Sequence, residues 1–235
     1  MPEDQKHYAT YNDVHELCKE SAEELNNWGI NLIIAIGGGG YIPARILRSF
    51  MKKEDGSNIP IQAIGLSLYE RLAKNSVEEV PGTEVKRLQW LDVNSSMINL
   101  IGKNVLIVDE VDDTRTTLQY AVEELQKDVK VAQKQLPSGS PLKGEETKFH
   151  VFVLHNKIKT KKGKLPGIAM NPKRYHAAVT TGDVWICYPW EADDIEDHDK
   201  LAKKNPIVAL PAETEKITEE PSTTTVLGEP SPKVD

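Results

Sequence analysis

The apolar positions of this chain fall into short continuous runs, and longer amphipathic stretches separate these runs. Residues 32–36 and 105–108 are apolar throughout and rich in Ile and Val, which is typical of strands buried on both faces. Residues 14–28 place their apolar side chains on one helical face, and residues 43–51 begin with a Pro that suits the first turn of a helix. Because buried strands alternate with helices, we predict an α/β fold in which helices cover both faces of a Rossmann-like parallel sheet.

The remaining apolar runs extend the same alternation. We expect further strands at residues 61–66, 149–154, 175–179 and 184–187, an edge strand at 86–91, and a helix at 116–125. Two polar stretches lack a clear period: residues 69–86, which we interpret as a long loop or flap, and residues 127–148, which we interpret as a connector.

Residues 205–235 differ in composition from the rest of the chain. They are rich in Pro, Glu and Thr and contain no aromatic residue. Such a segment cannot bury enough apolar surface to offset the entropy of ordering its backbone. We therefore predict one folded domain over residues 1–204, followed by a disordered, acidic tail over residues 205–235.

Charge and composition exclude several classes of protein. The chain has 29 Lys and Arg residues against 36 Asp and Glu residues, a net charge of −7, which disfavours a protein that coats nucleic acid. Its apolar runs of about five residues are far shorter than the roughly 20 that a membrane span needs, and its N-terminus lacks the apolar stretch of a signal peptide. Two cysteines, Cys18 and Cys187, cannot form a disulfide framework. We predict a cytoplasmic protein without a membrane or nucleic-acid partner.

The run from Val105 to Thr117 carries the strongest chemical signal. A buried strand ends in Asp109 and Glu110, and a short loop leads to the stretch Thr114-Arg115-Thr116-Thr117 at the start of the predicted helix. Backbone N–H groups, hydroxyl groups and the positive end of a helix dipole suit a phosphate. Carboxylates beside a phosphate require a divalent cation such as Mg²⁺ between them, or they accept sugar hydroxyls instead. The alternative without a ligand is an acidic turn in which a Thr caps the helix.

The same run closely resembles the phosphoribosyl-diphosphate (PRPP) signature of type I phosphoribosyltransferases, in which four apolar residues and two acids precede Asp-Thr and a helix. Three further segments agree with this family. Residues 35–43 resemble its pyrophosphate-binding loop, residues 66–70 the start of its mobile flap, and residues 183–191 the base-binding segment of its 6-oxopurine enzymes. The likeness covers roughly residues 7–204 and points to the fungal xanthine and hypoxanthine-guanine enzymes.

The resemblance implies a role for each part of the site. Asp113 would lie beside N7 of the purine as the general acid/base, and Asp109 and Glu110 would hold the ribose hydroxyls and, through water, Mg²⁺. Gly38 and Gly39 would flank a strained peptide bond that presents N–H to pyrophosphate. The residues implied for PRPP are Gly38, Gly39, Ser67, Tyr69, Arg87, Asp109, Glu110, Thr114, Arg115, Thr116 and Thr117. Those implied for the purine are Lys157, Trp185 and Ile186, and those implied for the metal are Asp109, Glu110 and Glu191.

Five of these positions keep an alternative interpretation. Trp185 stacks on the purine or lies in the core, and Lys157 binds O6 of the purine or belongs to a solvated basic run. Arg87 contacts pyrophosphate or is solvated, and Glu191 holds a second Mg²⁺ or belongs to an acidic surface. Many members of the family have Gly where this chain has Arg115, so we expect either a negative φ at this position or an additional cation for the phosphate.

The resemblance implies Mg²⁺-dependent transfer of the 5-phosphoribosyl group from PRPP to N9 of a 6-oxopurine, which yields a nucleoside monophosphate (XMP, IMP or GMP) and pyrophosphate. Residues 58–65 and 185–195 lean toward xanthine among the three bases. A small hood over the base would be formed by about residues 150–200, alone or with the N-terminus, and the family expectation is a homodimer. The alternatives are a non-catalytic sensor of PRPP or nucleotides on the same fold and a pyrimidine phosphoribosyltransferase.

Overall fold

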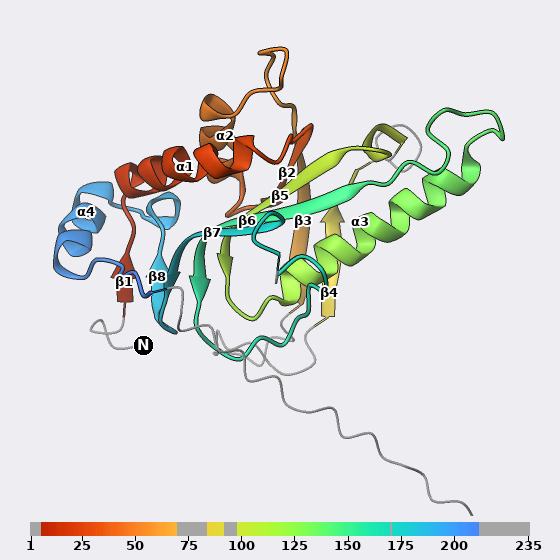
Figure 1. The fold of residues 1–235 in the computed structure, drawn as a ribbon. Helices are drawn as coiled ribbons and strands as arrows, with labels where there is room; N and C mark the ends of the chain where they lie inside the picture. Colours follow the sequence, from red (N-terminus) through yellow and green to blue (C-terminus); the bar gives the residue numbers. More distant parts are fainter. Residues whose placement is uncertain (1–5, 70–83, 92–97, 170, 212–235) are drawn as a thin grey trace, which may run out of the picture.

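The computed structural model describes residues 6–69, 84–91, 98–169 and 171–211. At its centre lies a six-stranded sheet with the strand order β4-β3-β2-β5-β6-β7 (Figure 1). Its parallel strands are β2 (Leu32–Gly37), β3 (Ile61–Tyr69), β5 (Asn104–Asp112), β6 (Lys148–Lys157) and β7 (Tyr175–Thr181). The edge strand β4 (Glu84–Gln89) pairs with β3 in the antiparallel direction. The predicted α/β fold with a mainly parallel sheet is therefore confirmed.

Helices cover both faces of this sheet, as the alternation of apolar runs predicts. The covering helices are α1 (Tyr11–Asn26), α2 (Tyr41–Phe50) and α3 (Thr116–Gln135). The described residues also form α4 (Ile195–Lys204) and short 3-10 helices at Ile98–Leu100 and Pro189–Glu191. In Figure 1, α1 and α2 lie on one face of the sheet and α3 lies on the other. Strand β2 is apolar throughout because both of its faces are covered: Ile33 and Ala35 pack in the cluster of α1 and α2, whereas Ile34 and Ile36 pack in the cluster of α3.

A small second unit lies beside the main sheet. Its two parallel strands are β1 (Lys6–Tyr8) and β8 (Trp185–Cys187), and α4 packs against β1 (Figure 1). His198 of α4 is hydrogen-bonded through Nε2 to the carbonyl oxygen of Ala9 at 2.8 Å. This unit joins the first described residues to the last part of the chain, in the region where the family resemblance puts the hood.

The observed elements differ from the predicted ones mainly in their extent. Helix α3 continues to Gln135 because Val129 and Ala132 keep the helical period and are buried, so the predicted polar connector is shorter than expected. The sequence patterns do not predict β1 or α4, whose residues are mostly polar. Both elements depend on partners that are distant in sequence, which a local pattern does not reveal.

The segment after α4 runs along the sheet as far as the structure describes it. The Leu210 N–H donates to the Thr180 carbonyl at 2.8 Å, and the Thr181 hydroxyl donates to the Val208 carbonyl at 3.0 Å. These bonds add a short extended segment to β7. The predicted start of the disordered tail at residue 205 is therefore too early.

Two predicted features fall largely outside the described residues. They are the flap, of which residues 70–83 are not described, and the greater part of the tail, residues 212–235. Of the helices that the structure does describe, none is long and apolar enough to cross a membrane.

Candidate active site

The chain changes direction across the sheet between β2 and β5, which are neighbours. Strand β2 leads to β3 on one side, and β5 leads to β6 on the other side. The loops at the carboxyl ends of these two strands therefore diverge, and in open α/β sheets this is where ligands bind. We call residues 37–40 after β2 the glycine loop, and residues 109–115 at the end of β5 the acidic loop.

The glycine loop has no room for a side chain at three of its four positions. A Cβ atom at Gly37 would overlap the end of the Tyr41 side chain. A Cβ atom at Gly39 would overlap the carboxylate of Glu110, and one at Gly40 would overlap the carbonyl oxygen of Val108. At Gly38, by contrast, a Cβ atom would meet nothing within 4 Å. The glycines thus let the backbone lie directly against β5 while Gly38 faces open space.

The irregular peptide bond of the glycine loop lies one residue earlier than the sequence predicts. The structure has a cis bond between Gly37 and Gly38, and not an unusual bond between Gly38 and Gly39. The prediction came from the family resemblance; in the structure β2 extends through Gly37, and the irregular bond follows directly after the strand.

Two adjacent carboxylates, Asp109 and Glu110, are half-buried in the acidic loop. Burial, with repulsion from Glu110, raises the pKa of Asp109 well above its ordinary value. Burial and the charge of Glu191 raise the pKa of Glu110 to about 7, although its Oε2 accepts a hydrogen bond from Trp190 Nε1 at 3.1 Å. Within the described residues these carboxylates are crowded by like charges, so a divalent cation would stabilise them.

Hard oxygen donors of this kind fit Mg²⁺, which binds one or two carboxylates together with phosphate oxygens and water. Among the described residues, no group of three His, Cys, Asp or Glu side chains converges on a point that could hold a metal. A cation beside Asp109 and Glu110 would therefore take its other ligands from substrate and water.

Two buried polar side chains, Tyr188 and His155, support the acidic loop through hydrogen bonds. The Tyr188 hydroxyl donates to the Glu110 carbonyl at 3.2 Å and lies 2.9 Å from Nδ1 of His155. Burial lowers the pKa of His155 to about 4, so its ring is neutral at pH 7. Because the Tyr188 proton is directed to Glu110, we assign the remaining hydrogen to Nδ1 of His155. The sequence patterns do not predict this supporting role for either residue.

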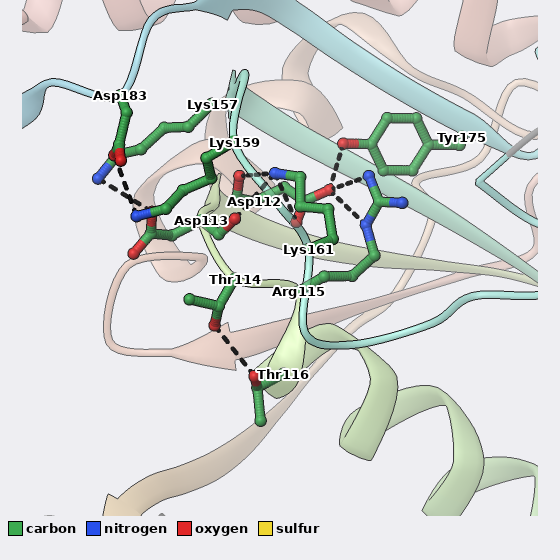
Figure 2. A network of polar contacts seen from close by, with 10 residues as sticks. All are labelled: Asp112, Asp113, Thr114, Arg115, Thr116, Lys157, Lys159, Lys161, Tyr175 and Asp183. Carbon is green, nitrogen blue, oxygen red and sulfur yellow. Dashed lines mark hydrogen bonds and ion pairs between the residues drawn. The ribbon is translucent and has the colours of Figure 1, made fainter. Parts of the chain in front are cut away.

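Asp113 lies between two lysines of the segment that follows β6 (Figure 2). Its Oδ1 is 3.3 Å from Lys157 Nζ and 3.1 Å from Lys159 Nζ, and Lys159 also pairs with Asp183 at 3.0 Å. Burial acts to raise the pKa of Asp113, but the two ammonium groups lower it overall, so the carboxylate is ionised at neutral pH. The structure brings together Asp113 and Lys157, which are two of the predicted site residues, and adds Lys159 to them.

The N-terminus of α3 has the features of an anion site. The hydroxyls of Thr114 and Thr116 lie 3.0 Å apart, and Thr116 is the first residue of the helix. The N-cap residue, Arg115, makes no side-chain capping bond. By contrast, Thr10 caps α1 by accepting a hydrogen bond from the Asp13 N–H at 3.1 Å. The alternative of an acidic turn with a capping Thr is therefore not what the structure shows.

Arg115 does not have the predicted negative φ. Its φ is +69°, in the left-handed region, and not negative. Its side chain is turned into the protein, where Nε and Nη2 donate to Asp112 Oδ2 at 2.9 and 2.7 Å. The charge of Arg115 is thus paired within the protein, because Asp112 lies only three residues away on the same loop.

Asp112 is the centre of a polar network that sequence reasoning missed (Figure 2). Its carboxylate is fully buried, and it accepts a hydrogen bond from the Tyr175 hydroxyl at 2.7 Å as well as those from Arg115. Lys161 Nζ lies 3.4 Å from the second oxygen. The partners Lys161 and Tyr175 are 49 and 63 residues away in the sequence, so no local pattern could indicate them.

Arg87 does not lie with the other predicted PRPP residues. It forms ion pairs with Glu124 and, at 2.9 Å, with Asp128, and its guanidinium lies 4.1 Å from the ring of Trp90. Glu124 follows Thr116 by eight residues, which places it about 12 Å along the helix axis. Arg87 is therefore held on the side of α3, away from its N-terminus.

The predicted base-binding residues lie on β8. Trp185 is 40% exposed, so it is not a core residue, while the neighbouring Ile186 is buried and pairs with β1. Glu191 is exposed and follows Trp190, the residue that binds Glu110. Ser67 and Tyr69 belong to β3 by their backbone, and their side chains lie outside the described part of the structure.

Comparison with known proteins agrees with this geometry. The model of the phosphoribosyl transferase domain matches residues 5–161. Hypoxanthine-guanine phosphoribosyltransferase of Schizosaccharomyces pombe is 56% identical over 199 residues, which cover 84% of this chain and 94% of that protein. Xanthine phosphoribosyltransferase 1 of Saccharomyces cerevisiae is 54% identical over 208 residues, which cover 86% of this chain and 98% of that protein. A solved structure of a Neisseria gonorrhoeae protein with bound ppGpp has 41% identity and a TM-score of 0.63, covering 86% of this chain and 97% of that chain.

Proposed function

The chain belongs to the phosphoribosyltransferase family, and we propose that it transfers the 5-phosphoribosyl group of PRPP to N9 of a 6-oxopurine. The products are a purine nucleoside monophosphate and pyrophosphate, so the enzyme acts in purine salvage. The two yeast relatives support this reaction by name and match the chain over most of their lengths. The ppGpp-bound neighbour supports a site that accommodates a guanine nucleotide.

The position of Asp113 is the observation that carries the proposal. Along the chain it precedes Thr114 and the N-terminus of α3, whose N-cap residue makes no side-chain capping bond, and its carboxylate contacts Lys157. A nucleotide whose 5′-phosphate lies at the helix N-terminus and whose base reaches Lys157 would have its glycosidic bond near Asp113. That position suits a group that moves a proton of the base during transfer.

In the reaction that we propose, the bond from N9 to C1′ forms as the bond from C1′ to pyrophosphate breaks. The proton on N7 of the base passes to the carboxylate of Asp113. When O6 of the purine takes up the ammonium group of Lys157, one of the two cations that lower the pKa of Asp113 is withdrawn. The carboxylate then becomes a stronger proton acceptor at the moment when the base is in place.

We assign the metal to Asp109 and Glu110, with the exposed Glu191 close enough to repel Glu110. When bound, Mg²⁺ would neutralise charge on the departing pyrophosphate. The glycine loop would act on the same group, because a backbone without side chains lets N–H groups approach anionic oxygens closely. Thr114, Thr116 and the N-terminus of α3 would bind the 5′-phosphate.

For the base, we propose that the exposed ring of Trp185 stacks on the purine and that the backbone of Ile186 reads its edge. Lys157 would donate to O6. Among the three 6-oxopurines we favour xanthine, which differs from hypoxanthine and guanine at C2 alone. We expect the active form to be a homodimer.

The test is a turnover assay of the purified full chain with PRPP, Mg²⁺ and each base in turn. We expect nucleotide formation with 6-oxopurines and the largest kcat/KM with xanthine, no formation with uracil or orotate, and loss of activity in EDTA that added Mg²⁺ restores. PRPP binding without turnover of any base would favour the non-catalytic sensor instead. Full activity in EDTA would refute the metal assignment alone.

A further inference from the structure

Arg115 adopts a backbone conformation that residues with a β-carbon rarely adopt. Its φ of +69° is the single positive φ among the non-glycine residues that the structure describes. In this conformation Cβ approaches the following carbonyl oxygen, and glycine escapes that penalty. The residue stands immediately before Thr116, where α3 begins. Contacts with the surrounding structure must therefore hold the backbone of Arg115 in this left-handed turn.

The Arg115 side chain supplies one of the restraints. Its Nε and Nη2 both donate to a single oxygen of Asp112, at 2.9 and 2.7 Å, and its guanidinium lies 5.3 Å from the ring of Tyr175. Asp112 is fully buried, and the Tyr175 hydroxyl donates to the same oxygen at 2.7 Å. Figure 2 shows the guanidinium pointing to Asp112 and Tyr175, on the side away from the hydroxyls of Thr114 and Thr116.

The segment after β6 supplies the other restraints by binding successive carbonyl groups of the acidic loop. Lys161 Nζ donates to the carbonyls of Asp112 and Asp113 at 2.6 and 2.9 Å. The N–H groups of Lys162 and Gly163 both donate to the Thr114 carbonyl at 3.0 Å. The carbonyl oxygens of three consecutive residues are thereby fixed on one side of the loop.

Gly163 adds a steric restraint to these hydrogen bonds. It is buried directly against the backbone of Arg115, where a Cβ atom would overlap the Arg115 carbonyl group. The backbone of the acidic loop is therefore held by contacts with segment 161–163 and by the Asp112 carboxylate.

We propose that Asp112 and Arg115 are positioning residues that hold the left-handed turn before α3, and that Arg115 contributes to PRPP binding through this conformation and not as a cation on the phosphate. A left-handed residue in such a turn directs successive N–H groups into one concavity, which binds anions. The ion pair with Asp112 gives Arg115 the conformation that glycine reaches without help. This inference rests on the proposed function, because the anion is the 5′-phosphate of PRPP.

The decisive comparison is between Arg115→Gly and Arg115→Ala, with PRPP affinity measured by calorimetry. Both variants lack the guanidinium, but only the Ala variant carries a β-carbon in the left-handed turn. We expect the Gly variant to bind PRPP more tightly than the Ala variant by about five- to thirty-fold, the factor that corresponds to the cost of this conformation for a residue with a β-carbon. If the side chain were a phosphate ligand, the Gly variant would lose that contact as well and would bind PRPP far more weakly than the wild type, which would overturn the proposal.

Removing Arg115 alone leaves the buried Asp112 with fewer partners, which could destabilise the fold. The same comparison is therefore repeated with Asp112→Asn in both variants, so that no buried carboxylate is left without its arginine. Thermal unfolding monitored by circular dichroism checks that each variant is folded. The preference for Gly over Ala should persist in this background, and equal affinities there would also overturn the proposal.

Steady-state kinetics give a readout that a general loss of structure would not reproduce. The difference between Gly and Ala should appear in KM for PRPP, while KM for the purine is the same in both variants. A wild-type protein that does not bind PRPP would refute the proposed function instead. That result differs from equal binding by the two variants, so the two failures are distinguishable.

Discussion

The glycine loop and the acidic loop lie at neighbouring strand ends, and they are held in place in opposite ways. The glycine loop packs against β5 because Gly39 and Gly40 lack side chains that would overlap Glu110 and Val108. The acidic loop is held by side chains, chiefly through the buried carboxylate of Asp112. Substitutions that add atoms should therefore disturb the glycine loop, whereas substitutions that remove side-chain atoms should disturb the acidic loop.

This difference follows from what each loop contributes to the proposed reaction. A loop that offers backbone N–H groups to pyrophosphate gains from close approach, and glycine permits it. A loop that offers a carboxylate such as Asp113 needs side chains, and these must be oriented by their neighbours. The contrast predicts which kind of substitution each loop tolerates, and the following experiments test it from the largest expected effect to the smallest.

The largest effect is expected for Asp113→Asn in the acidic loop. Asn keeps the shape of the side chain but cannot accept the proton of the base. We expect kcat to fall by about 10²–10⁴-fold, the usual contribution of general acid–base catalysis, while the affinity for PRPP changes much less. Steady-state kinetics with PRPP and the purine varied separately provide the measurement.

The matched control for Asp113→Asn is Asp183→Asn. That substitution removes the other carboxylate that pairs with Lys159 but leaves the proposed proton acceptor in place. It should affect kcat far less than Asp113→Asn. Equal losses in the two variants would assign the effect to the lysine and would contradict the catalytic role of Asp113.

In the glycine loop, adding one carbon should be enough to cause damage. Gly40→Ala would force a β-carbon against the Val108 and Ile36 backbones, and overpacking of this kind costs about 1–3 kcal/mol of unfolding free energy. Gly38→Ala, where a β-carbon meets nothing within 4 Å, should leave the free energy of unfolding unchanged. Urea denaturation of both variants distinguishes them, and equal stabilities would show that the loop relaxes away from β5.

Acid should reduce the stability that His155, which supports the acidic loop through Tyr188, contributes to the fold. Burial lowers the pKa of His155 to about 4, so the folded protein holds the ring neutral, whereas the unfolded chain takes up a proton below about pH 6.5. The stability that this residue contributes is fully present above pH 6.5 and is lost as the pH falls toward 4. At pH 5 the loss amounts to about 2 kcal/mol.

Other groups titrate in the same pH range, so the measurement is the difference in unfolding free energy between the wild type and a variant that lacks His155. The pKa of Glu110, raised to about 7, makes its own contribution change in the opposite direction on acidification. His155→Gln removes the buried ring, and its unfolding free energy should fall less between pH 7 and pH 5 than that of the wild type. Replacing the exposed His15 by Gln is the control, and a parallel curve for His155→Gln would contradict the assignment.

The smallest effect is expected for the segment that follows α4. A chain that ends at Pro211 should have the same stability as the full chain. A chain that ends at Asn205 loses the hydrogen bonds of residues 206–210 to His7, Thr180 and Thr181, and we expect a loss of roughly 1–2 kcal/mol. Both should keep their kcat at saturating substrate, and a large fall in kcat would mean that this segment supports the site after all.

The sequence predicts the sheet and both loops for physical reasons. Strands such as β2 and β5 are apolar on both faces because helices cover both faces. A continuous apolar run within one short segment is therefore enough to identify them. The acidic loop combines a strand end, paired acids and a helix start within 13 residues, Val105 to Thr117. These features depend on neighbours in the chain and can be read without knowing the fold.

What the sequence does not predict depends on residues far apart in the chain. Strand β1 is formed by polar residues that become a strand through pairing with β8, and α4 buries only two of its side chains, His198 and Ala202. The role of Asp112 depends on Lys161 and Tyr175, which the topology brings to it. Lys159 and Lys161 read as a solvated basic run until the fold places them against the acidic loop.

The pairing of β1 with β8 also sets the order in which the molecule can be built. His7 and Pro206, which are hydrogen-bonded, are 199 residues apart, so this part of the protein has a very high contact order. During synthesis at about 5–20 residues per second, Lys6 leaves the ribosome roughly 10–40 s before its partner Trp185 does. The main sheet can condense in that interval, and the unit that carries Trp185 must assemble last. A newly made chain would therefore acquire its phosphate-binding loops before it acquires the unit proposed to select the base.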